Sequence, residues 1–114
     1  MALYEVQALP DAALAASARF HANQLPLIEI ALTALDEPLT IIFPPADHTH
    51  RGWRRAVVQE LARAYAPIRI NAVAADSDAA ISAAVGYFET AKGVTGQYFL
   101  LVGAGAGAVL SSEE

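Results

Sequence analysis

The sequence predicts an α/β protein with three layers, α/β/α, in which helices flank a small, mainly parallel sheet of about four strands. Short apolar, β-branched segments alternate along the chain with longer segments whose apolar residues recur at helical spacing. Proline and glycine residues separate the two kinds of segment. Because a helix lies between each strand and the next, we expect parallel strands, right-handed crossovers and a single domain over residues 1–114.

The first half of the chain contains two predicted strands and one long predicted helix. Residues 2–9 alternate loosely between apolar and polar side chains, which predicts a strand with one solvated face. Residues 12–35 are rich in alanine and carry apolar residues at three- and four-residue steps, which predicts a helix. Pro26 interrupts that helix, so we expect a kink or a break there. Residues 39–43 predict a strand covered on both faces, and two prolines end it.

The second half repeats the alternation of helix and strand. An apolar stripe predicts a helix over residues 49–65, and we expect Trp53 on this stripe to anchor a contact within the domain or across a dimer. A strand over 68–73, a helix over 78–91 and a strand over 97–102 follow. A stretch of glycine and alanine and a polar tail complete the chain.

Composition and charge exclude several classes of function. The 114 residues include seven basic and twelve acidic side chains and give a net charge of −5, so we expect no nucleic-acid partner. The absence of cysteine excludes disulfides, thiol catalysis and cysteine-based zinc sites. Hydrophobic residues make up 55%, which suggests that some apolar surface is buried against a partner. We interpret four clustered arginines as one solvated helix face: Arg51, Arg54, Arg55 and Arg63.

No segment reads as a signal peptide or a membrane span. The N-terminal residues have no basic region, and Glu5 comes early. The longest apolar stretch, residues 99–110, is much shorter than the roughly 20 residues that cross a bilayer. We therefore expect a cytoplasmic protein without a membrane partner.

Three segments in order resemble the short-chain dehydrogenase/reductase family. Residues 60–74, Glu-Leu-Ala-Arg-Ala-Tyr-Ala-Pro-Ile-Arg-Ile-Asn-Ala-Val-Ala, are the most specific match and resemble the end of the family's catalytic helix and the strand after it. Residues 21–35, with the run His-Ala-Asn-Gln-Leu-Pro, resemble its long helix. Residues 86–103, ending in Gly-Gln-Tyr-Phe-Leu-Leu-Val-Gly, resemble its last helix, turn and strand. The resemblance implies a Rossmann-like fold and a truncated homologue that corresponds to the C-terminal half of a full-length member.

The resemblance also implies a degenerate catalytic site. The family's Tyr and Lys, four residues apart, fall on Asp47 and Arg51, while Asn23 stands at the position resembling its fourth catalytic residue. An ionised Asp cannot act as the acid that the Tyr provides, and the planar guanidinium of Arg is not a plain substitute for Lys. The family's Gly-rich dinucleotide turn has no counterpart here. We therefore expect no catalytic residues and no cofactor, with NAD or NADP bound only if a partner completes the site.

Two further patterns have alternative interpretations. Asp47, His48 and His50 could hold a metal ion, or one His could act as a base, but a capped, solvated helix start is the simpler interpretation. The glycines of residues 103–107 follow a strand like those of a nucleotide loop, yet the helix that such a loop must open is missing. We expect His21 to pack in the core or at an interface.

The leading hypothesis is a non-catalytic, truncated short-chain-dehydrogenase-like protein that acts through self-association or partner binding. A homodimer or tetramer would form through the helices over 12–35 and 49–65. The alternative is one subunit of a split or heteromeric NAD(P)-dependent oxidoreductase, with a protein partner that supplies the dinucleotide site and the catalytic Tyr. A small-ligand or metal binder that uses the His cluster is a third possibility.

Overall fold

The computed structural model describes residues 1–102 and 109–112. The strands are β1 (Ala2–Glu5), β2 (Leu39–Phe43), β3 (Ile70–Ala74), β4 (Tyr98–Val102) and β5 (Val109–Ser112). The helices are α1 (Ala13–Arg19), α2 (Leu25–Leu32), α3 (Arg51–Ala64) and α4 (Asp78–Thr90). A π-helical turn, η1 (Phe20–Gln24), joins α1 to α2, and a 3-10 turn, η2 (His48–His50), precedes α3.

The described strands form one sheet in the order β1-β2-β3-β4-β5. The first four strands are parallel, which confirms the predicted α/β class and the predicted parallel sheet. The fifth strand pairs with β4 in the antiparallel direction and was not predicted, because four residues with no alternation read as a polar tail. The glycine stretch over 103–107 lies outside the described residues.

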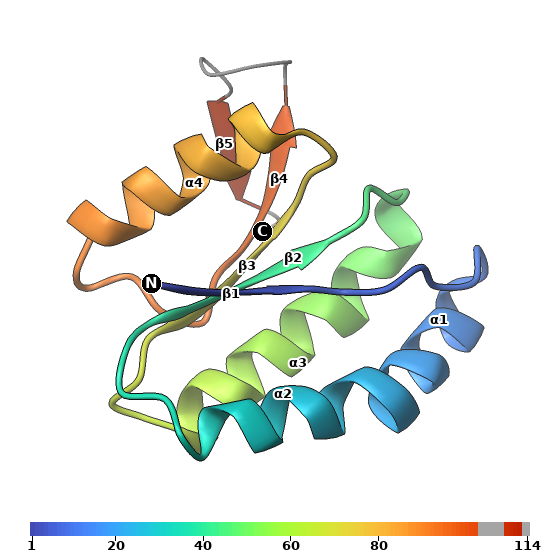
Figure 1. Cartoon of the computed structure of the whole chain (residues 1–114). Coiled ribbons are helices and arrows are strands. Elements are labelled where there is room, and N and C mark those ends of the chain that lie inside the picture. Colours follow the sequence, from blue (N-terminus) through green and yellow to red (C-terminus); the bar gives the residue numbers. More distant parts are fainter. Residues whose placement is uncertain (103–108, 113–114) are drawn as a thin grey trace.

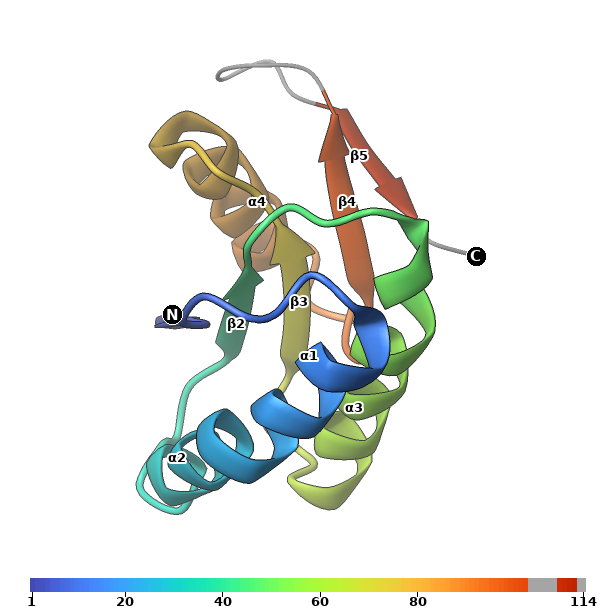
Figure 2. The same ribbon diagram turned by 90° about the vertical axis from the view of Figure 1, so that its right-hand side faces the viewer.

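The helices cover the two faces of the sheet unequally. The helices α1, α2 and α3 lie on one face, whereas α4 lies on the other (Figures 1 and 2). Each of the parallel strands β1 to β4 lies next to the one before it, in the same direction across the sheet. The crossover through α4 runs over the opposite face from the crossovers through α1, α2 and α3, so it has the opposite hand. The expectation of uniformly right-handed crossovers is therefore wrong for the β3–α4–β4 unit.

Two polar side chains, one just before β3 and one within it, hold this unusual crossover in place. Nη1 of Arg69 donates to the carbonyls of Phe88 (3.0 Å) and Ala91 (3.2 Å), at the C-terminal end of α4. The buried Asn71 donates to the Val94 carbonyl (3.0 Å) and accepts from the backbone N–H of residue 97 (3.1 Å). These bonds tie both the end of α4 and the turn before β4 to β3, and they add acceptor contacts at a helix end, where carbonyls have no partner within the helix.

The same turn requires a glycine. Gly96 has φ +75°, a region that residues with a Cβ adopt rarely, and its N–H donates to the Ile70 carbonyl at 2.7 Å. A Cβ at this position would stand 3.5 Å from Cβ of Ala62 on α3. The turn can therefore lie against α3 and still form the hydrogen bond that leads the chain into β4.

Two hydrophobic clusters lie on opposite faces of the sheet. Every residue of β2 and of β3 is buried, as the continuous apolar run over 39–43 predicts. Ile41 and Phe43 pack with η1, α2 and α3, whereas Ile42 packs with α4. The alternation follows from the two-residue period of a strand. The larger cluster, on the face of α1 to α3, surrounds the site described below.

The predicted helix over 12–35 breaks at Pro26, as expected. Pro26 lies in the first turn of α2, and the π-helical turn comes directly before it. The N–H of Leu25 donates to the Phe20 carbonyl, five residues back, so one extra residue enters the turn. Gln24 is thereby buried, and its Oε1 accepts from the Tyr4 hydroxyl at 2.8 Å. The break thus joins the helical segment to β1.

The first strand is shorter than the predicted range 2–9. Pairing with β2 ends at Glu5, and one further bond joins the N–H of Val6 to the Ile42 carbonyl at 2.9 Å. After that point the chain leaves the sheet to reach α1. The loop over residues 6–12 therefore lies at the carboxyl end of the sheet, where it contributes to the site.

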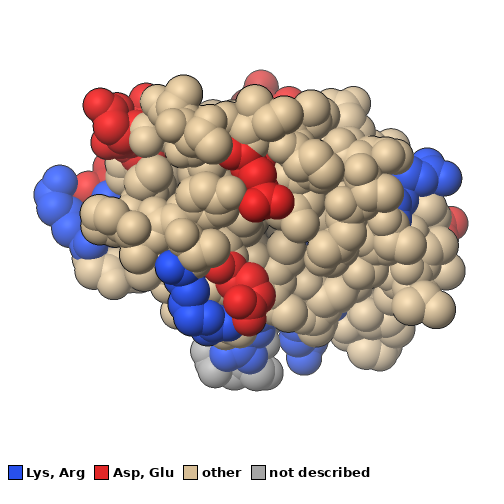
Figure 3. Space-filling view, turned by 90° about the horizontal axis from the view of Figure 1, so that it is seen from below, with Lys and Arg blue, Asp and Glu red and all other residues tan. Residues whose placement is uncertain are grey.

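Several large apolar side chains remain exposed on the helical face. Leu14 is 87% exposed, Leu27 is 53% exposed and Ile30 is 67% exposed, all within the segment from α1 to α2. Figure 3, which views the molecule from the side of these helices, shows broad areas without charge between separate acidic and basic residues. Exposed alanines accompany them: Ala15, Ala18, Ala22, Ala31 and Ala34.

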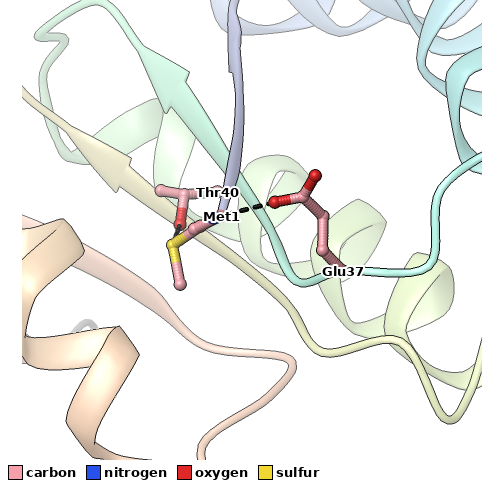
Figure 4. Close-up of polar contacts among 3 residues, drawn as sticks. All are labelled: Met1, Glu37 and Thr40. Atoms are coloured by element: carbon pink, nitrogen blue, oxygen red, sulfur yellow. Dashed lines mark hydrogen bonds and ion pairs between the residues drawn. The ribbon is translucent and has the colours of Figure 1, made fainter.

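The start of β1 is held by an ion pair and by its own strand pairing. The amino group of Met1 lies 2.8 Å from Oε1 of Glu37, and the Thr40 hydroxyl donates to the Met1 sulfur at 3.0 Å (Figure 4). The bond to Glu37 is the main reason that the pKa of the Met1 amine is raised above its ordinary value of 8.0. Burial opposes this shift, and the charges of Glu37 and Glu89 reinforce it.

The Met1–Glu37 pair predicts a pH-dependent contribution to stability. A raised pKa means that the folded chain holds this proton more tightly, so the contribution is full below about pH 8 and is lost as pH rises through the folded pKa. Glu37→Gln should therefore lower the unfolding free energy at pH 7 and have less effect at pH 10. Urea denaturation of both proteins at the two pH values measures this. A difference that does not shrink at high pH would contradict it.

Candidate functional site

The largest described cavity beside the carboxyl ends of the strands lies between two loops. We name it the strand-end cavity, and its volume is about 400 Å³. It lies between the β1–α1 loop and the loop that joins β2 to α3, at the edge where parallel α/β sheets bind ligands. Its lining residues are Ala8, Leu9, Pro10, Asp11, Pro44, Pro45, Ala46, Asp47, His50 and Arg54.

His50 closes one side of the strand-end cavity and uses both ring nitrogens. The Trp53 indole N–H can only donate, so Nδ1 of His50 accepts from it at 3.3 Å. Nε2 then donates to the Asp11 carbonyl at 2.8 Å. The buried imidazole therefore joins the start of α3 to the β1–α1 loop, and neither ring nitrogen remains for a metal ion or for proton transfer.

Arg54 forms the floor of the site and corrects one sequence interpretation. The side chain was expected on a solvated helix face, yet it is 1% exposed. Its guanidinium carbon lies 4.6 Å from the centre of the Phe43 ring, and Nη1 donates to the Pro44 carbonyl (2.8 Å) and the Tyr98 hydroxyl (3.2 Å). Nε has no hydrogen-bond partner. The aromatic face and the carbonyl attract the charge and make this burial possible.

Asp47 caps the turn that leads into α3. The Thr49 hydroxyl and the Thr49 backbone N–H (2.9 Å) both donate to Oδ1 of Asp47. These bonds, the hydroxyl's first, lower the pKa of the carboxyl below its usual 3.8, and the neighbouring histidines add to the shift. Asp47 is therefore ionised at neutral pH. The expectation of a capped helix start is confirmed for this residue.

The fold brings together only some of the residues that the sequence analysis named as degenerate catalytic positions or metal-site candidates. Asp47, His48 and Arg51 line a recess of about 60 Å³ beside Tyr98. Asn23 lies apart from them, exposed on the π-helical turn, and does not line the strand-end cavity. Within residues 1–102 and 109–112, no group of three His, Asp or Glu side chains is placed to hold a metal ion.

Trp53 and His21 were both expected to pack against other side chains, and the structure places them differently. Trp53 is half-buried, and its ring lies 5.3 Å from that of Phe20 and 5.7 Å from that of Phe43, so its contacts are within the domain. His21 is exposed, so it does not pack in the core, and the alternative of an interface position stays a prediction. Its Nδ1 bonds to the Ser17 carbonyl at 2.7 Å, one turn back on the helix.

Residues 4–101 match the family model described as "short chain dehydrogenase-like protein". The chain belongs to this family. No curated protein and no solved structure matches it. The match runs from within β1 to within β4, so the short chain dehydrogenase-like fold is the one described above. The described helices of this family member include none that is long and apolar enough to cross a membrane.

Sequence reasoning overlooked His50 and Arg54 as the buried polar residues of the site. A signal for both was present, because His50, Arg54, Val57 and Leu61 follow one another at four-, three- and four-residue steps. All four are buried. The two polar members were assigned to the solvated side because their residue types are seldom buried, although their positions continue the apolar stripe.

We call the two hydrogen bonds of His50, to Trp53 and to Asp11, the His50 clip. The clip predicts that replacing His50 destabilises the fold much more than replacing the nearby His48. His50→Ala removes both of its hydrogen bonds and leaves the part-buried indole N–H of Trp53 without its acceptor, so we expect a loss of about 2–4 kcal/mol of unfolding free energy. His48→Ala, at an exposed position, should change it by less than about 0.5 kcal/mol. Urea denaturation followed by Trp53 fluorescence measures both. Equal effects would show that the clip does not stabilise the fold.

Proposed function

We propose that this short chain dehydrogenase-like protein is a non-catalytic module that acts by self-association. The first support comes from the position that resembles the family's proton-donating Tyr. Asp47 stands where the resemblance places the catalytic Tyr, and its pKa is lowered rather than raised. A carboxyl of this kind has no proton to give at neutral pH. The retained family fold thus lacks the group that would donate a proton to a carbonyl substrate.

The exposed apolar side chains of the α1–α2 segment supply the second support. Leu14, Leu27 and Ile30 are each more than half exposed, and the neighbouring exposed alanines are small enough for another helix to approach closely. A folded monomer rarely leaves a large contiguous apolar surface in water, so we infer that another chain covers these side chains. This exposed apolar face is the observation that carries the proposal.

A second copy of the chain is the occupant that fits this face. The described part of the segment carries few charges, and Glu29 is engaged by the Tyr65 hydroxyl at 2.8 Å. Two-fold pairing places the same apolar side chains against each other and needs no complementary charge. On α3, Trp53 packs against Phe20 and Phe43, and the Tyr65 hydroxyl after it bonds to Glu29, so α2 contributes more to the proposed contact than α3.

A heteromeric oxidoreductase remains the second candidate, favoured by the edge of the sheet. Among the described strands, β1 pairs with β2 alone, and Leu3 on β1 is 52% exposed. Such an edge can accept a strand from another chain. A partner with a dinucleotide-binding half could extend the sheet there and supply the missing catalytic groups.

Charged substitutions on the α1–α2 face and on the β1 edge distinguish self-association from assembly with a different partner. Leu27→Glu with Ile30→Glu should convert a dimer into a monomer, because two buried carboxylates would face their copies. Leu3→Glu, the matched control, should leave the dimer intact. Sedimentation at micromolar concentration measures each. A monomeric wild-type protein would refute self-association, and a dimer lost only in Leu3→Glu would move the contact to the sheet edge.

The isolated chain should not bind NAD(H) or NADP(H). The loop after β1 contains no glycine, and two prolines follow β2, so neither connection resembles a phosphate-binding turn. Calorimetric titration with each cofactor tests this, with a full-length dehydrogenase as the positive control. Micromolar binding by the isolated chain would contradict the non-catalytic proposal and favour an oxidoreductase.

A further inference from the structure

His50 is a buried side chain whose two hydrogen bonds exist together only while its ring is neutral. The residue is 4% exposed, and it ends the turn η2. A neutral imidazole has one nitrogen that donates and one that accepts, whereas a protonated imidazole has two that donate. In the His50 clip, Nδ1 accepts from the Trp53 indole N–H and Nε2 donates to the Asp11 carbonyl. A proton added to Nδ1 would point at another N–H, so the clip and the second proton exclude each other.

The charged groups around His50 do not draw a proton onto the closed clip. Asp47 and a protonated His50 attract each other, and the carboxylate of Asp11 lines the same cavity. Arg54, one turn later on α3, lines it too and carries the opposite charge. The other titratable residues of η2, of α1, which packs against it, and of the first turns of α3 are His48, Arg19, Arg51 and Arg55. Positive groups are at least as numerous as negative ones here, so the direction of the hydrogen bonds decides that the clip holds a neutral ring.

The strand-end cavity gives a protonated ring a place to go. His50 lines this cavity. Both nitrogens belong to one rigid ring, so a ring that turns away from the Trp53 N–H also leaves the Asp11 carbonyl. Turned toward the cavity, the imidazolium meets water and the exposed carboxylate of Asp47, which the Thr49 bonds keep ionised. Two arrangements of one side chain therefore suit its two protonation states.

We propose that protonation of His50 releases the β1–α1 loop and thereby weakens association through the exposed apolar face of the α1–α2 segment, an inference that rests on the proposed function. Within residues 1–102 and 109–112, the bond from His50 is the hydrogen bond that joins residues 8–12 to a part of the chain beyond α1. Leu9 packs against the core, so the segment that gains freedom begins at Pro10. Leu14 of the exposed apolar face lies in the first turn of α1, and its position depends on this segment.

The proposed switch acts on the acid side of neutral pH. A histidine in water gains its proton near pH 6.5, about the middle of the range in which this side chain acts as a switch. Because the released ring can take up a proton and the closed clip cannot, the clip is fully effective above about pH 6.5, and each pH unit below that favours the released form up to about tenfold. The lowered pKa of Asp47 keeps its carboxyl ionised over this range, so it remains available to the imidazolium.

A pH titration of the wild-type protein tests the switch. The Trp53 indole N–H resonance reports on the bond to Nδ1 of His50, and Trp53, the one tryptophan of the chain, also reports by fluorescence. Between about pH 7.5 and about pH 5, we expect the indole resonance to move toward that of a solvated indole, with the same midpoint as the Cε1–H resonance of His50. An unchanged indole resonance, or a different midpoint for the His50 ring, would overturn the proposal.

The variant His50→Gln separates the ring proton from other effects of acid. Its amide offers one acceptor oxygen and one donor nitrogen and does not titrate, so this variant should keep the clip and lose the pH response. His48→Gln, the matched control, removes a titratable ring from an exposed position of the same turn and should respond as the wild type does. A full response in His50→Gln would overturn the role of His50. If circular dichroism shows that His50→Gln is unfolded, the wild-type midpoints decide alone.

Sedimentation at the same two pH values tests the link to the exposed apolar face. We expect the wild-type dissociation constant to rise at least about tenfold at the lower pH, and that of His50→Gln to change less than about twofold. A dimer equally tight at both pH values, together with a changing indole resonance, would overturn the link. A wild-type protein that is monomeric at both pH values would refute the proposed self-association itself, and the indole titration would still decide the switch.

Discussion

The guanidinium of Arg54, stacked 4.6 Å from the centre of the Phe43 ring, sets the arrangement of the carboxyl end of the sheet. It is held by the Pro44 carbonyl at the end of β2 and by the Tyr98 hydroxyl at the start of β4, so one side chain of α3 links two strands. Burying a charge costs of the order of several kcal/mol unless such partners compensate it. The neighbouring rings and the His50 clip can therefore be understood as the surroundings that make this burial possible.

The fold could be predicted further than the site. The continuous apolar run of residues 39–43 and the stripe that includes Val57 and Leu61 depend on backbone periodicity, which a sequence displays directly. The burial of Arg54 depends on Phe43, Pro44 and Tyr98, which come close only once the sheet has formed. Judged by residue type alone, Arg54 was therefore expected at the surface. Strand β5 was not predicted for a similar reason. Its four residues show no strand pattern in the sequence, and they form a strand because they pair with β4.

The two halves of the chain differ in what maintains the sheet. Around β1 and β2, apolar packing dominates, and Gln24 supplies one buried polar bond to Tyr4. Around β3, polar bonds from Arg69 and Asn71 fix a crossover of the less common hand. These side chains lie in the segment that most resembles the dehydrogenase family. In this chain, the bonds that fix the crossover lie at the end of the sheet opposite to the strand-end cavity.

The π-helical turn sets the rotational phase of α2 relative to α1. Each residue of an α-helix advances the side-chain direction by about 100°. The extra residue in Phe20–Gln24 therefore determines that Ile28 and Leu32 face the core while Leu27 and Ile30 face outward. A relative that lost one residue in this turn would turn a different side of the same helix to the surroundings. Insertions and deletions here would thus change which side chains of α2 are exposed without any substitution in α2 itself.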